Sequence, residues 1–146
     1  MLKTKAAVVA KPTLQYKKEN SVDEKTADCI AYMLSAAPSF HKLHLRVNGE
    51  ASYSQHMALK DLYEGLPGLV DSIAEGYQGA CEMILEYPEV VSVNLKSVEE
   101  AIDYLRELSS KIAELQIVMP HSEIVNDLDV IKSLINSTKY KLLFLK

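Results

Sequence analysis

Large aromatic residues, cysteines and long apolar runs are all scarce in this sequence. Its 146 residues include no tryptophan, two phenylalanines and two cysteines. Cys29 and Cys81 are too few and too far apart for a zinc motif or a disulfide framework, so we expect buried or half-buried thiols in a reducing, cytoplasmic location. No apolar run approaches the ~18 residues that cross a bilayer, and the first residues lack the apolar core of a secretory signal. We therefore expect no membrane association.

The signatures of several common enzyme classes are also missing. The sequence has no glycine-rich phosphate-binding loop, and no spacing suggests a Ser-His-Asp or Cys-His arrangement. Apolar residues make up 48% of the chain and charged residues 25%, which is typical of a globular protein. We therefore set these enzyme classes aside and expect one globular domain with a real core.

The net charge of −4 is unevenly distributed. Residues 1–20 contain five lysines and one glutamate, a net charge of +4, so the remaining residues sum to −8. This segment contains Pro12 and has no helical periodicity, which predicts an extended arm. Lysines on an arm neutralise phosphates without reading sequence, so non-specific DNA binding is one interpretation and a solvated or partner-docked tail is the other. The candidate DNA contacts are Lys3, Lys5, Lys11, Lys17 and Lys18.

Two helical patterns, both interrupted by proline, follow the arm. A capping box at residues 21–24 opens the first pattern, and Gly49 predicts its end. A potential cap at Ser52 opens the second pattern, which runs to near Glu86. The prolines inside the two patterns predict a kink near Leu34 and a bend at residues 67–68.

Two further patterns complete the chain. A capping box at residues 97–100 opens the cleanest amphipathic stripe of the sequence. Pro120 closes that helix or opens the last one. Four helices with mostly short connections predict an all-α fold, a four-helix bundle over residues 21–146.

Histidines and carboxylates form the most informative pattern of the chain. His44, His56, Asp71 and Glu75 follow one another at intervals of 12, 15 and 4 residues. Imidazoles and carboxylates both ligate transition metals, and residues four apart share one helix face. The pattern predicts a metal site between helices. The alternative for each residue is a hydrogen-bonded core histidine or a solvated acidic face.

Two other histidines are weaker candidates for a metal site. His41 could share the face of His44, although a surface position is the simpler interpretation. His121 follows Pro120 at a helix start, where a structural role is more plausible.

Residues 41–79 resemble Dps, the starvation-induced miniferritins of the ferritin-like superfamily. The resemblance rests on His44-x-x-Val47-x-Gly49, on His56, and on Leu62-Tyr-Glu64 leading to Val70-Asp71-x-Ile73-Ala74-Glu75. The helices also match in number, length and order, so the resemblance extends over about residues 21–146. It implies that the bundle is a ferritin-like four-helix bundle.

The resemblance also implies a function. Dps proteins oxidise ferrous iron between two subunits and store the ferric mineral in a hollow homo-dodecamer. In that pattern His44 and His56 come from one subunit, and Asp71 and Glu75 come from its two-fold mate. Many members bind DNA through a lysine-rich arm, as residues 1–20 would. Two histidines with carboxylates suit iron, manganese or zinc, and the resemblance favours iron.

The sequence departs from the Dps pattern at one important position. Dps proteins place a carboxylate four residues after the second histidine, whereas this chain has Lys60. An ammonium group repels a cation by about 1–4 kcal/mol at surface-like dielectrics. Asp61 is rotated by about 100° and could replace the carboxylate only on an irregular helix. The alternative function is therefore a non-catalytic ferritin-like structural or assembly protein with a degenerate metal site.

Overall fold

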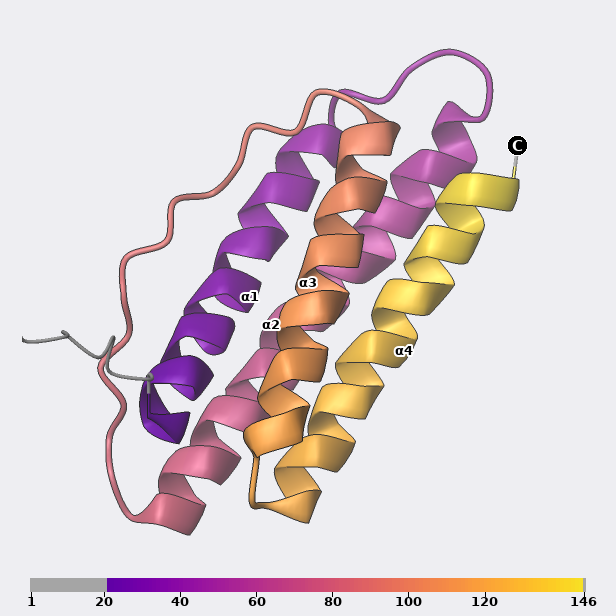
Figure 1. The fold of residues 1–146 in the computed structure, drawn as a ribbon. Coiled ribbons are helices and arrows are strands. Elements are labelled where there is room, and N and C mark those ends of the chain that lie inside the picture. The colour runs from indigo at the N-terminus through magenta and orange to yellow at the C-terminus, as the bar shows by residue number, and fades with distance from the viewer. Residues whose placement is uncertain (1–20, 146) are drawn as a thin grey trace, which may run out of the picture.

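The computed structural model describes residues 21–145, which form four α-helices (Figure 1). Their bounds are Val22–His44 for α1, Ser52–Cys81 for α2, Val98–Val118 for α3 and Ser122–Phe144 for α4. The described residues contain no strand, so the predicted all-α class is confirmed. Within this part of the chain, no helix has both the length and the apolarity needed to cross a membrane.

The four helices form a bundle in which each one is antiparallel to its neighbours. α2 packs against α1 and α4, and α3 packs against the same two helices on the other side. α1 and α4 run in one direction and α2 and α3 in the other (Figure 1). Because α2 and α3 are parallel and diagonally placed, residues 82–97 must return along the length of the bundle. The fold therefore has one long crossover and two short connections.

The predicted capping box opens α1, but this helix ends earlier than predicted. The Ser21 hydroxyl accepts a hydrogen bond from the Glu24 N–H, and the Glu24 carboxylate accepts one from the Ser21 N–H. The helix then runs through Pro38 to His44 instead of Gly49. Beyond that end, the Arg46 guanidinium donates to the side chain of Asn94 and the carbonyl of Leu95, which holds this segment against the end of the crossover.

The start of α2 is where the sequence predicts it, but Ser52 is not the cap. Ala51 occupies the N-cap position in the left-handed region, at φ 62°, and makes no side-chain capping bond. Gly49 also has a positive φ, of 86°. Two left-handed residues within three positions reverse the chain, and the Ser52 N–H donates to the Gly49 carbonyl inside this turn.

α2 ends at Cys81 and not near Glu86, and a glutamine side chain explains the difference. Glu82 adopts the left-handed conformation that commonly ends helices. The amide oxygen of Gln78 then accepts hydrogen bonds from the Leu85 N–H and the Tyr87 hydroxyl. Leu85 is buried, so the chain leaves the helix axis to place this side chain in the core.

The start of α3 is correctly predicted, although only half of the expected capping box forms. The Ser97 hydroxyl accepts from the Glu100 N–H at 3.1 Å. The Glu100 carboxylate accepts from the N–H of Lys96 and not from that of Ser97. The carboxylate therefore fixes the last residues of the crossover as well as the start of the helix.

The core consists of one apolar stripe from each helix, with Leu85 and Leu95 added by the crossover. Leu34 and Ala80 lie outside it, because Leu34 is 45% exposed and Ala80 is also exposed. Leu34 faces the crossover and lines a shallow groove with Tyr87 and Pro88. The crossover thus covers this side of α1 incompletely.

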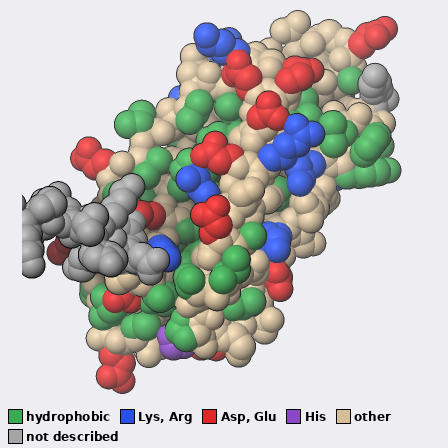
Figure 2. All heavy atoms as spheres, viewed as in Figure 1, with side chains coloured by type: hydrophobic (Ala, Val, Ile, Leu, Met, Phe, Trp, Pro, Cys, Tyr) green, Lys and Arg blue, Asp and Glu red, His purple; other side chains and the backbone are tan. Residues whose placement is uncertain are grey.

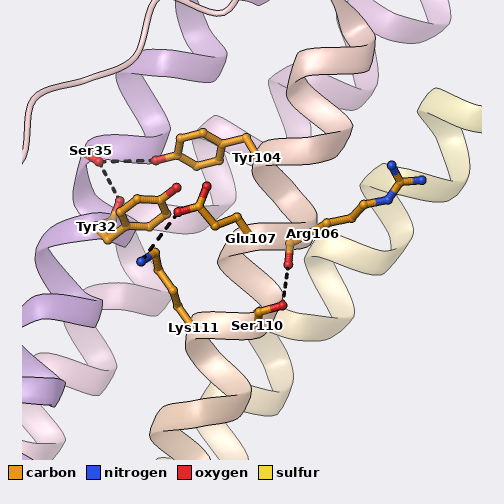
Figure 3. A network of polar contacts seen from close by, with 7 residues as sticks. All are labelled: Tyr32, Ser35, Tyr104, Arg106, Glu107, Ser110 and Lys111. Carbon is orange, nitrogen blue, oxygen red and sulfur yellow. Dashed lines mark hydrogen bonds and ion pairs between the residues drawn. The ribbon is translucent and has the colours of Figure 1, made fainter.

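Polar and aromatic side chains join α1 to α3 beside the crossover (Figure 3). The Tyr104 ring stacks on the Tyr32 ring at a centroid separation of 5.1 Å, and the Tyr104 hydroxyl lies 3.4 Å from the Ser35 hydroxyl. The Lys111 ammonium lies over the Tyr32 ring and pairs with Glu107. Burial raises the pKa of Tyr32 well above its usual range, so this phenol stays protonated.

Alanine substitutions at two glycines are expected to change the free energy of unfolding in opposite directions. Gly68 lies inside α2 at a negative φ, and an added Cβ would meet no atom within 4 Å. Gly68→Ala should therefore raise the free energy of unfolding by about 0.5–1 kcal/mol. Gly49→Ala should lower it by roughly 1–2 kcal/mol, because alanine is strained at φ 86°. Urea unfolding of both variants checks the prediction, and equal effects would contradict it.

Candidate metal centre

His44 and His56 lie in direct contact at one end of the bundle. His44 is the last residue of α1 and His56 lies in the second turn of α2. Their rings stack with centroids 3.5 Å apart, and His44 is only 6% exposed. The turn at residues 45–51 brings the two residues together, so the two histidines that the sequence singled out do share one location.

Each of these histidines is hydrogen-bonded to the backbone of the other. His44 Nδ1 lies 2.8 Å from the His56 carbonyl oxygen, and His56 Nδ1 lies 3.0 Å from the His44 carbonyl oxygen. A carbonyl oxygen only accepts, so both Nδ1 atoms carry hydrogen. In the neutral rings this leaves Nε2 with a lone pair. Within residues 21–145 neither Nε2 atom has a hydrogen-bond partner, so both lone pairs are unused there.

The same contact explains a structural role for the pair. The last carbonyls of a helix have no partner inside that helix. His56 supplies a donor to one of them, the His44 carbonyl at the end of α1. The Nδ1 atoms therefore hold the α1–α2 corner together, while the Nε2 atoms are not needed for that purpose.

His41 and Tyr63 extend the histidine pair into an aromatic cluster. The His41 ring stacks on the Tyr63 ring at 4.0 Å, and the His44 ring meets Tyr63 edge-on at 5.1 Å. His41 is exposed, as predicted, and Tyr63 is half-buried. Tyr63 thus fixes both rings on α1 from its position on α2.

Asp71 and Glu75 do not meet the histidines within one chain. Both carboxylates are exposed on α2. The axial rise of an α-helix places Asp71 about 22 Å from His56, and Glu75 still farther. Across residues 21–145, no three histidine, cysteine, aspartate or glutamate side chains gather closely enough to share a metal ion. One copy therefore holds a histidine pair and, far from it, an acidic pair.

The charged residues after His56 are engaged in ion pairs. Lys60 is one turn from His56 on the same face of α2, and its ammonium lies 3.8 Å from the Glu64 carboxylate. Asp61 instead receives a hydrogen bond of 2.9 Å from Lys141 on α4. Because α2 is continuous here, Asp61 is directed toward α4 and does not replace the missing carboxylate.

A Cys-His contact that the sequence did not suggest lies at the opposite end of the bundle. The Cys81 sulfur is 3.6 Å from His121 Nε2, so the fold forms a Cys-His contact that no spacing in the sequence suggests. The two residues are 40 positions apart, and only the pairing of α2 with α4 brings them together. The half-buried Cys81 and fully buried Cys29 otherwise agree with the prediction.

A groove lies between α1, α3 and the crossover. Its volume is about 700 Å³, and its polar lining consists mainly of Lys25, Asp28, Lys111 and Glu114. Cys29 also contributes to the wall, and burial raises its thiol pKa to about 12. The lysines and carboxylates balance in charge, so the groove favours neither anions nor cations.

The predicted DNA contacts, Lys3, Lys5, Lys11, Lys17 and Lys18, lie outside the described residues. Comparison with characterised proteins and with solved structures gives no significant match. A family profile does match, over residues 44–142, which include the histidine pair, the acidic pair and most of α4. The chain therefore belongs to DUF5856, a family of unknown function.

Proposed function

We propose that this protein binds ferrous iron at a site completed by a second copy of the chain, in the manner of the Dps miniferritins. His44 and His56 of one copy would supply nitrogen ligands, and Asp71 and Glu75 of the other copy would supply oxygen ligands. The observation that carries the proposal is the pair of stacked histidines whose Nε2 atoms have no partner within the described residues.

The ligand chemistry of the histidine pair and of the acidic pair supports a site shared in this way between two copies. Imidazole and carboxylate ligands together suit ferrous iron, manganese or zinc. Two carboxylates would neutralise the charge of a divalent cation, which two neutral imidazoles cannot do. The carboxylates of Asp71 and Glu75 are exposed and therefore accessible to another subunit.

The connectivity of the bundle supports a ferritin-like fold. Ferritin-like bundles have one long crossover, whereas simple up-and-down bundles have only short loops. Here residues 82–97 form such a crossover between two parallel, diagonal helices (Figure 1). The Dps resemblance of residues 41–79 and this connectivity are separate reasons for the same proposal.

Exposed apolar side chains near the histidine pair suit a partner subunit. Leu45 and Tyr53 are 71% and 79% exposed, and Phe144 at the end of α4 is 69% exposed. The Ser54 hydroxyl donates to the Leu145 carbonyl, which places the end of α4 beside the start of α2. Figure 2 displays apolar side chains gathered near the C-terminal end of α4. Clusters of this kind are typical of protein interfaces.

Lys60 favours a second candidate function, a ferritin-like assembly protein that does not oxidise iron. The Lys60 ammonium and the Glu64 carboxylate form a pair at 3.8 Å one helical turn from His56. A positive charge in this place weakens cation binding. In this alternative the scaffold and its oligomeric contacts remain, and turnover of iron is lost.

Asparagine variants separate metal binding from the structural role of the histidines. The asparagine amide nitrogen can occupy the place of Nδ1 and keep the hydrogen bond to the facing carbonyl, but asparagine has no counterpart of Nε2. We expect His44→Asn and His56→Asn each to weaken ferrous iron binding by about tenfold or more, while His41→Asn leaves it unchanged. Anaerobic iron titration measures the affinity. Equal affinity in all variants would reject the histidine site.

Mixing two deficient variants tests whether the site lies between subunits. A chain with His44→Asn and His56→Asn and a chain with Asp71→Asn and Glu75→Gln should each bind iron poorly. After the two are unfolded together and refolded, mixed assemblies should regain part of the wild-type binding capacity, because some sites then combine intact halves. Separately refolded samples are the control. No recovery in verified mixed assemblies would contradict a shared site.

Replacing Lys60 distinguishes the two candidate functions. Lys60→Glu removes a positive charge and supplies a carboxylate one turn from His56, so iron affinity should rise by about tenfold or more. Ferric absorbance after ferrous iron is added in air measures oxidation by dioxygen. Oxidation by Lys60→Glu but not by the wild type would identify the natural protein as the non-oxidising form. Lys139→Glu, on α4, is the charge-matched control.

A further inference from the structure

A thiol, an imidazole and a carboxylate lie next to one another in space, in that order, at the end of the bundle opposite to His44 and His56. The Cys81 sulfur is 3.6 Å from His121 Nε2. On the other side of the same ring, His121 Nδ1 is 3.9 Å from the Glu123 carboxylate. A nucleophile, a base and a group that stabilises the protonated base are therefore aligned through one imidazole.

Close packing of α2 against α4 sets this alignment. A Cβ added at Gly76 would lie 2.9 Å from Ile124 Cδ1, so the absence of a side chain at Gly76 lets α4 approach α2. His121 occupies the N-cap position of α4, yet its side chain makes no capping hydrogen bond. The imidazole is instead directed toward the last residue of α2, which is Cys81.

Tyr77 restricts the orientation of the His121 ring. The two rings meet edge-to-face, with centroids 5.8 Å apart and an interplanar angle of 84°. The Tyr77 hydroxyl in turn donates to the Asp23 carboxylate at 2.6 Å. Burial, followed by this hydrogen bond, raises the pKa of Tyr77 above its usual range. The tyrosine therefore stays protonated and packs against the edge of the imidazole.

We propose that Cys81 is a thiol-modification site that reacts with small disulfides, with His121 as the proton acceptor. The sulfur attacks one sulfur of the disulfide while His121 Nε2 takes the thiol proton. A mixed disulfide forms on Cys81, the disulfide bond of the reagent breaks, and the second half leaves as a thiolate. His121 then returns its proton to that thiolate, so one disulfide and one protein thiol give one mixed disulfide and one small thiol.

The site is accessible to such a reagent. Cys81 is half-buried, whereas Gly79, Ala80 and Glu82 around it are exposed. Cys29 is the natural comparison within the same chain, because it is 5% exposed and burial raises its pKa to about 12.

Reaction of the full-length protein with dithiodipyridine tests the proposal. This reagent is a small disulfide that releases a coloured thione. Under native conditions we expect one fast-reacting thiol per chain, and in urea two. Cys81→Ser should abolish the fast reaction, whereas Cys29→Ser should keep it. The native Cys81 rate should exceed the rate of the same thiol in urea by about tenfold or more.

His121→Gln tests the role of the imidazole. This variant should slow the native reaction by about tenfold or more, and His41→Gln, at the other end of the bundle, should not. Urea unfolding confirms that the variants are folded. If His121→Gln unfolds the start of α4, the native-to-urea rate ratio of the wild type remains an independent test. The proposal would be overturned if wild-type Cys81 reacted no faster in the folded protein than in urea. It would also be overturned if a folded His121→Gln variant reacted at the wild-type rate.

Discussion

Burial of the apolar stripe of α2 is the constraint on which the rest of the structure depends. Leu59, Leu62, Leu66, Val70 and Ile73 are fully buried along this helix, and α2 packs against both α1 and α4. At one end this packing places His56 against His44, and at the other it places Cys81 against His121. Both polar sites are therefore consequences of how one long helix is held between two neighbours.

Much of the fold could be predicted from local sequence, because its signals act over a few residues. The capping serines at positions 21 and 97 and the helical spacing of apolar residues predict where helices begin and which faces are buried. The end of α2 could not be predicted in this way. It depends on Gln78 bonding to the residues that follow and on the burial of Leu85, and both are features of the folded chain.

The candidate sites were predictable only in part, for a similar reason. The 12-residue interval between His44 and His56 spans one helix corner, so sequence reasoning could place them together. The contact between Cys81 and His121 depends on tertiary pairing of α2 with α4 and on the close approach at Gly76. No interval in the sequence encodes that distance. The positions of Asp71 and Glu75 follow from helix geometry, whereas the partner proposed for them lies in a second copy of the chain, which one sequence does not place.

The crossover has a consequence for how the chain folds. α1 with α2, and α3 with α4, are helical hairpins closed by short connections, so their contacts are local in sequence and have a small entropic cost of loop closure. Pairing α1 with α3 and α2 with α4 must instead close much longer loops, which include the crossover at residues 82–97. Local contacts form faster than distant ones. The architecture therefore favours a pathway in which two preformed hairpins dock, and the docking step creates the Cys81–His121 contact last.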